Sequence, residues 1–299
     1  MVVCSARIAV VGPGAIGAVF AASAVQAGQR DLLLCGRRPL DGLVVTRDGR
    51  DPVVIDGPVL TDPADAGGPA TWILLAVKAH QTEGARAWLE ALSDPGSVVV
   101  VLQNGVEHLQ RVQPLANGAT VLPAIVWCPA EASAPGRVRL RGQPRLSVPA
   151  VPAGQALADL LGEGAHVDLV DDFTTEAWRK LCVNAVAGLM PLAGRRAAMF
   201  RDPDMARLAQ DLAAECLAVA RAEGANLPER LAATMAADFA AMPSDLGSSI
   251  LFDREARRPL EWDARNGVIR RLAARHRIPT PVSDVIVPLL AAASDPGDS

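Results

Sequence analysis

Residues 8–17 of the chain, Ile8-Ala9-Val10-Val11-Gly12-Pro13-Gly14-Ala15-Ile16-Gly17, decide the fold. Four apolar residues are followed by three glycines, at positions 12, 14 and 17, that fit the pattern G-x-G-x-x-G. The apolar run predicts a buried parallel strand, and the Ala-rich stretch from 14 to 26 predicts a helix. A second apolar run at 32–35 predicts another buried strand, which completes a βαβ unit.

Each glycine of this loop meets a different steric requirement. Gly12 permits a tight turn from strand to helix, Gly14 lets the backbone approach a pyrophosphate, and Gly17 lets the helix pack closely on the strand. The free N–H groups and positive dipole end of the helix would face the phosphates. The sequence therefore predicts a Rossmann domain whose dinucleotide site includes Gly12, Gly14, Ala15, Ile16 and Gly17. The alternative is a plain glycine turn.

The end of the second strand indicates which dinucleotide binds. A carboxylate about 20 residues past the loop would bind the ribose hydroxyls of NAD. That position is Arg37 here, and Arg38 follows it. A guanidinium can pair with a 2′-phosphate, so the sequence favours NADP(H) as the cofactor. The alternative is a solvated basic pair.

The rest of the chain changes character near residue 170. Before it, apolar runs predict strands at 72–77, 98–102, 120–128, 136–140, 145–148 and 167–170, short β segments within 42–60, and helices at 82–92, from 107 and at 154–161. After it, helical periodicity covers 174–189, 203–224, 228–242 and 262–276, and prolines interrupt the segment from 279 to 288. We therefore predict an α/β Rossmann domain with a mostly parallel sheet over 1–170, followed by an all-α domain over 171–299.

Composition argues against several other classes of protein. The 299 residues carry a net charge of −4 with no basic face, so nucleic acid is not an expected partner. Five widely spaced cysteines and four scattered histidines suggest neither a disulfide framework nor a metal site. No apolar run is long enough to cross a membrane, and glycines and a proline interrupt the N-terminal stretch where a signal peptide would be helical. We expect a cytoplasmic protein.

Polar motifs follow the glycine loop in a fixed order. Lys78 lies in AVKAHQ and Asn104 in QNGV. Residues 176–184 form EAWRKLCVN, Ser248 and Ser249 follow, and Glu261 lies in EWDARNG. With these motifs the chain resembles the ketopantoate reductase family (2-dehydropantoate 2-reductases) over nearly its whole length, and the resemblance implies a 6-phosphogluconate-dehydrogenase-like fold.

The resemblance implies NADPH-dependent reduction of a 2-oxo acid to a 2-hydroxy acid, as in pantothenate biosynthesis. It places the catalytic lysine at Lys180 and an acidic partner at Glu261. Lys78 and Asn104 would contact the cofactor, and Asn104 would also contact the substrate. The substrate would further meet Lys180, Asn184, Ser249 and Glu261.

The chemistry of these residue types suits that reaction. Hydride addition to a ketone places negative charge on its oxygen, and a positioned ammonium can stabilise that charge and deliver a proton. Lys180 and Asn184 are four residues apart, so a helix would present them on one face.

Two positions depart from the family pattern. Gly188 and Leu246 stand where the family often has asparagines, which predicts a roomier and more apolar pocket and, as substrate, ketopantoate or a related, more apolar 2-oxo acid. Two alternatives stay open: another 6-phosphogluconate-dehydrogenase-like enzyme, such as a β-hydroxyacid dehydrogenase, and a non-catalytic NADP-binding sensor. If the protein is an enzyme, we expect its substrate to be a small molecule. We also expect a homodimer.

Overall fold

The computed structural model describes residues 6–294, which pack into two units. The first unit contains the chain up to Gln103 and the segment Glu107–Phe173. The second contains Asn104–Val106 and the chain from Thr174 onward. A three-residue loop of the N-terminal half therefore packs with the C-terminal helices.

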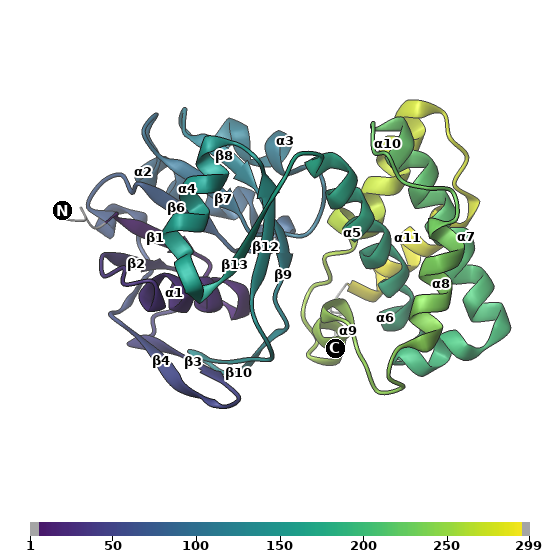
Figure 1. Ribbon diagram of the computed structural model, residues 1–299, viewed down its shortest axis with the longest axis horizontal. Helices are drawn as coiled ribbons and strands as arrows, with labels where there is room; N and C mark the ends of the chain where they lie inside the picture. The colour runs from purple at the N-terminus through teal and green to yellow at the C-terminus, as the bar shows by residue number, and fades with distance from the viewer. Residues whose placement is uncertain (1–5, 295–299) are drawn as a thin grey trace. The chain divides into compact units, whose positions relative to one another are not determined.

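A parallel sheet forms the centre of the first unit (Figure 1). Its six strands are β5 (Val59–Leu60), β2 (Leu32–Cys35), β1 (Ile8–Val11), β6 (Trp72–Leu75), β7 (Val98–Val101) and β8 (Thr120–Pro123), in that spatial order. Every neighbouring pair is parallel. This confirms the predicted Rossmann-type sheet, in which the strand order reverses at β1.

Helices cover both faces of this sheet. Ile8 and Val10 pack with α1 (Ala15–Gln26) and α4 (Pro152–Leu161), whereas Ala9 and Val11 pack with α2 (Arg86–Leu92) and α3 (His108–Val112). Because alternate side chains point to opposite faces, a strand buried on both sides needs an uninterrupted apolar run. This is why the short runs in the sequence predict the strands well.

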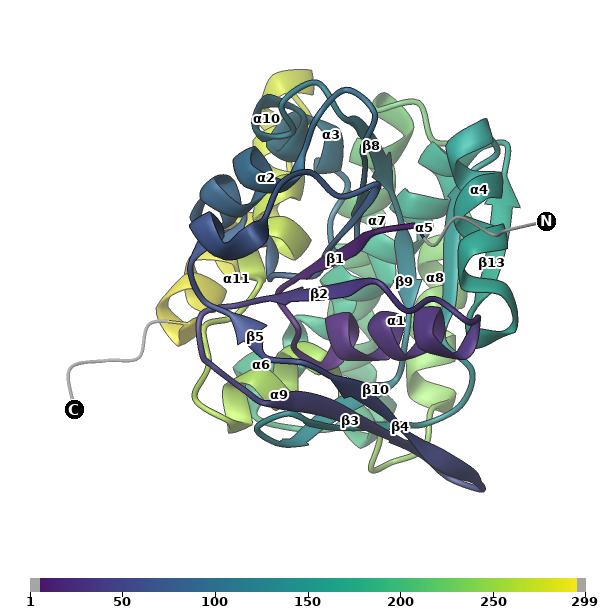
Figure 2. The same ribbon diagram turned by 90° about the vertical axis from the view of Figure 1, so that its left-hand side faces the viewer.

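Two smaller sheets complete the first unit. One has the order β10 (Ala130–Ala134), β11 (Arg137–Leu140), β3 (Gly42–Arg47) and β4 (Arg50–Asp56), and it packs against α1 (Figure 2). The other has the order β13 (His166–Val170), β12 (Arg145–Pro149) and β9 (Ile125–Trp127). The single strand predicted over 120–128 is wrong, because β8 and β9 belong to different sheets. Pro123 lacks the N–H that a continuing ladder needs.

The second unit is helical, as predicted. Its α-helices are α5 (Phe173–Ala187), α6 (Leu189–Ala193), α7 (Pro203–Ala222), α8 (Leu231–Ala241), α9 (Ser249–Glu255), α10 (Val268–His276) and α11 (Pro281–Ser294). One apolar core joins them, and α7 lies against α8, α10 and α11 (Figure 1). Within this core the sulfur atoms of Cys182 on α5 and Cys216 on α7 lie 3.1 Å apart.

The sequence does not predict three of these helices, α6, α9 and α11. The prolines at the chain's end suggest an interrupted segment, yet α11 runs from Pro281 through Pro288. Pro281 is tolerated because it lies in the first helical turn, where its missing N–H has no intrahelical partner, whereas Pro288 lies inside the helix. The helix predicted over 262–276 also differs, since it begins with a π-helical segment, Asp263–Gly267.

Candidate active site

The glycine loop has the backbone geometry that a phosphate site requires. Gly12 has a φ of +88°, and a Cβ there would lie 2.8 Å from the backbone nitrogen of Val77. A Cβ on Gly17 would lie 2.4 Å from the carbonyl oxygen of Gly12, so α1 packs directly on the loop. Neither position can carry a side chain, in agreement with the roles predicted for these two glycines.

The loop is open on the side where a phosphate would approach. A Cβ on Gly14 would meet no atom within 4 Å. Gly14 is also the N-cap of α1 and gives that helix no side-chain cap. The N–H groups at the first turn, around Ala15 and Ile16, are therefore available to an anion. These residues fit the pyrophosphate of a dinucleotide.

Other predicted cofactor residues follow the carboxyl ends of neighbouring strands. Arg37 comes after β2 and is exposed, while Lys78 comes after β6 and is half-buried. The backbone N–H of Lys78 donates to Oε1 of Gln81 at 3.4 Å. Because β2 and β6 flank β1, these residues and the glycine loop share the switch-point edge of the sheet, where open α/β sheets bind ligands.

A cluster of polar side chains lies in the second unit. The Nδ2 of Asn104 donates to Oε2 of Glu261 at 3.0 Å, and the Nδ2 of Asn184 lies 3.4 Å from Oδ1 of Asn104. Glu261 is only 3% exposed and Asn184 only 7%. Three residues separated by up to 157 positions in the chain thus meet in one place.

The fourth member of this cluster, Arg265, is not among the residues that the sequence predicts. Its Nη2 donates to Oδ1 of Asn184 at 2.8 Å, and its Nη1 lies 3.5 Å from Oγ of Ser249. Arg265 is 3% exposed. Burial lowers the pKa of its guanidinium, and the negative charges of Glu261 and Asp253 oppose that effect. Its motif, EWDARNG, marks Glu261 but gives no signal for the arginine.

The remaining predicted residues occupy different environments. Lys180 lies one helical turn before Asn184 on α5 and is half-buried. Ser249 is exposed at the first position of α9, and the hydroxyl of the preceding Ser248 accepts from the N–H of Leu251 and caps that helix. Ser248 therefore has a structural role as a helix cap, whereas the hydroxyl of Ser249 lies near Arg265.

Two family models together match most of the chain. The model described as "Ketopantoate reductase PanE/ApbA" matches residues 8–153, and the model of the C-terminal part of the same family matches residues 172–294. The chain belongs to the ketopantoate reductase family. Members of this family reduce a 2-oxo acid to a 2-hydroxy acid with NADPH, which confirms the predicted oxidoreductase class and cofactor.

Curated ketopantoate reductases resemble the chain along nearly its whole length. A 2-dehydropantoate 2-reductase of Mycobacterium tuberculosis is 55% identical over 96% of this chain and 98% of its own length. One of Caulobacter vibrioides is 37% identical over 96% of this chain and 99% of its own. A crystal structure of a family member from Ralstonia eutropha has a TM-score of 0.87 at 28% identity, covering 97% of this chain and 98% of that one.

At the first departure from the family pattern, the predicted extra room is wrong. A Cβ on Gly188 would lie 2.7 Å from Oδ1 of Asn266, so a polar amide fills the space beside this glycine. Asn266 is 1% exposed, and its Nδ2 donates to the carbonyl of Ala185 at 3.1 Å. Its Oδ1 has no hydrogen-bond partner. At the second departure, Leu246 is 44% exposed.

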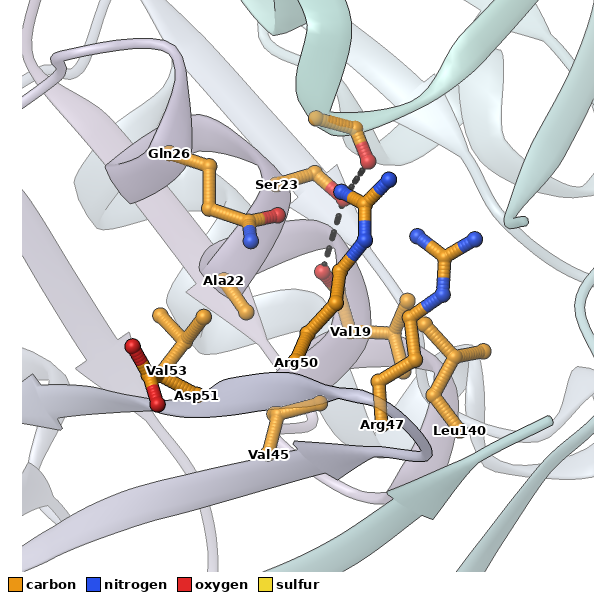
Figure 3. Close-up of a pocket in the computed structure, with 11 residues that line it drawn as sticks. Val19, Ala22, Ser23, Gln26, Val45, Arg47, Arg50, Asp51, Val53 and Leu140 are labelled. Atoms are coloured by element: carbon orange, nitrogen blue, oxygen red, sulfur yellow. Dashed lines mark hydrogen bonds between the residues drawn. The ribbon is translucent and has the colours of Figure 1, made fainter. Parts of the chain in front are cut away.

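A small pocket in the first unit lies away from the predicted cofactor site (Figure 3). It is lined by the second half of α1, including Ser23 and Gln26, and by Arg47 and Arg50 of the β3–β4 hairpin. The Ser23 hydroxyl already bonds the carbonyls of Val19 and Gly164. The phosphates are predicted to bind at the opposite end of α1, so this pocket lies apart from the predicted dinucleotide site.

Two absences hold for residues 6–294, the part of the chain that the structure describes. No helix in this range is long and apolar enough to cross a membrane. Within the same range, no three side chains of His, Cys, Asp or Glu come together as metal ligands.

Proposed function

We propose that this protein reduces ketopantoate to pantoate with NADPH. The observation that carries the proposal is the meeting of Asn104, Asn184 and Glu261, which occupy the family's motif positions, in one hydrogen-bonded cluster. The 55% identity to a 2-dehydropantoate 2-reductase over nearly the full chain supports the same substrate.

The proposed roles follow from charge and position. The nicotinamide, when bound, supplies a hydride to the ketone carbon. The Lys180 ammonium stabilises the negative charge that develops on the ketone oxygen and transfers a proton to it. Asn184, one turn along α5, and Ser249 hold the carboxylate end of the substrate. The glycine loop and Arg37 hold the pyrophosphate and the 2′-phosphate of the cofactor.

The environment of Gly188 favours a substrate with a hydroxyl over an apolar one. A buried acceptor without a partner costs about 1–3 kcal/mol, and Asn266 Oδ1 is such an acceptor. It lies where the side chain of the family's asparagine would begin. A substrate hydroxyl that reached this oxygen would satisfy it, which favours ketopantoate over a more apolar 2-oxo acid among the substrates expected from the sequence.

Steady-state kinetics with a matched pair of substrates tests the proposal. Trimethylpyruvate differs from ketopantoate only in lacking its hydroxyl. We expect NADPH oxidation with both, and a kcat/KM for ketopantoate about 10-fold or more above that for trimethylpyruvate. Equal values would contradict recognition of the hydroxyl.

The same assay separates the alternative functions. Oxidation of a 3-hydroxy acid in preference to reduction of any 2-oxo acid would indicate a β-hydroxyacid dehydrogenase. Tight NADPH binding without turnover of any 2-oxo acid would indicate a sensor.

A further inference from the structure

The polar cluster of the second unit is a chain of hydrogen bonds with one direction. Arg265 donates to Oδ1 of Asn184, Nδ2 of Asn184 faces Oδ1 of Asn104, and Nδ2 of Asn104 donates to Glu261. A guanidinium can only donate, and an ionised carboxylate can only accept. The charges at the two ends therefore fix which way both amides between them point.

This direction determines what the two amides can offer to a ligand. Each amide oxygen accepts from its neighbour in the chain, and each NH₂ group has a second N–H beyond the one used in the chain. The second N–H of each amide remains as a donor, which suits the oxygens of a carboxylate, while each amide oxygen is turned toward its neighbour in the chain. An uncharged amide ligand would bring its own N–H donors against them.

The surroundings of Arg265 favour a role in orienting these two amides. It lies in the π-helical segment Asp263–Gly267, a distortion often found at functional sites. Its Nε is buried and has no acceptor, and its Nη1 reaches the Ser249 hydroxyl only at 3.5 Å. The shortest hydrogen bond of the guanidinium is therefore the 2.8 Å bond to Asn184.

We propose that Arg265 is a positioning residue that locks the Asn184 amide, while Glu261 holds Asn104, with the N–H groups of both amides toward the substrate, and that Arg265 thereby selects carboxylates over neutral amides. The inference rests on the proposed function, because it assigns Asn184 to the carboxylate end. Without the guanidinium, the Asn184 amide can turn and present its oxygen, which repels a carboxylate.

Binding of pantoate and of its primary amide to the full-length protein with NADP⁺, measured by calorimetry, tests the proposal. The wild-type protein is expected to bind pantoate at least about 10-fold more tightly than the amide. Arg265→Met should reduce this preference by about 10- to 100-fold, since it removes a hydrogen bond from a charged donor. Arg265→Lys should restore part of it.

Two further variants control for a structural effect. Arg270→Met removes an exposed arginine of α10 that pairs with Asp284, and it should leave the preference unchanged. Asn184→Asp keeps a partner for Arg265 but replaces the donor NH₂ by an oxygen, so it should abolish the preference for pantoate even if Arg265→Met does not fold.

The outcomes separate this inference from the proposed function. A wild-type preference for pantoate that both Arg265→Met and Asn184→Asp remove supports the inference, even if ketopantoate is not reduced and the proposed function fails. A wild-type protein without the preference overturns the inference, and so does a folded Arg265→Met or Asn184→Asp variant that retains it.

Discussion

At the scale of single residues, Lys180 has the central part in the proposed reaction. It is half-buried on α5, one turn from the buried Asn184, so the helix fixes the spacing between the proton donor and the carboxylate-binding amide. A positioned general acid typically contributes a factor of 10²–10⁴ to the rate. No other residue in the proposal transfers a proton.

Replacing Lys180 by alanine should therefore lower kcat by about 10²–10⁴-fold. The dissociation constant of NADPH, measured by fluorescence titration, should change little. Arg179→Ala is the matched control, because this neighbour pairs with Glu176 on the partly exposed side of α5. A change in kcat of less than a few-fold for Lys180→Ala would remove this residue from the role of general acid.

Arg37 is the residue on which the choice of cofactor depends. Arg37→Asp should raise the KM for NADPH by about 10- to 100-fold, because a carboxylate repels the 2′-phosphate that the guanidinium would bind. The KM for NADH should change much less. Steady-state kinetics with NADPH and with NADH measures the two KM values. Equal increases in both would show that Arg37 does not contact the 2′-phosphate.

Arg265 and Asn266 are residues of the site that the sequence alone does not predict. Lys180, Asn184 and Glu261 lie in segments that carry a family motif, so the sequence indicates them. Arg265 is a charged residue in a stretch with helical periodicity, and such a residue is usually solvated. Its burial depends on a π-helical segment and on side chains distant in sequence, which no local pattern contains.

At the scale of elements, α11 depends on a contact from another helix. The buried carboxylate of Glu215 on α7 accepts from the N–H groups of Val282 and Ser283 at 2.6 and 2.8 Å, and from the Ser283 hydroxyl at 2.6 Å. It therefore caps α11 from outside and places a negative charge at the positive end of the helix. This tertiary cap lets a proline-rich segment fold as a helix. The sequence predicts the strands better than α11, because the apolar run of a strand is local in the sequence whereas the cap of α11 comes from another helix.

Glu215→Gln should lower the free energy of unfolding by about 1–3 kcal/mol, because the amide lacks the charge and one acceptor. Urea denaturation followed by circular dichroism measures the change. Asp211→Asn is the matched control, since it removes an exposed carboxylate one turn away on the same helix. Equal stabilities of the Glu215→Gln and Asp211→Asn variants would contradict the capping role.

At the scale of the whole molecule, each unit has apolar core clusters of its own, and both units contain buried thiols. Cys35 lies in the core beneath the parallel sheet, and Cys216 lies in the core of the helical unit. Burial raises the pKa of Cys35 to about 12 and raises that of Cys216 as well. The division into domains at residue 170, the homodimer and the cytoplasmic location stay predictions at this scale.

These thiols should make both cores sensitive to alkaline pH. The thiol of the unfolded chain ionises near pH 8.5, whereas the folded protein keeps both thiols neutral to a higher pH. Their contribution to stability is therefore complete below about pH 8.5 and is lost as the pH rises toward 12, with a slope of about 1.4 kcal/mol per pH unit for each thiol.

Urea unfolding between pH 7 and 10.5 measures this loss. The double variant Cys35→Ala, Cys216→Ala should lose less stability over this range than the wild-type protein, although it starts lower because it leaves cavities. Cys128→Ala, at a half-buried thiol, is the control and should follow the wild-type slope. If the double variant has the same pH dependence as the wild-type protein, the two thiols do not account for the alkaline loss of stability. Lysine and arginine side chains titrate equally in all three proteins, so the difference between their slopes isolates the buried thiols.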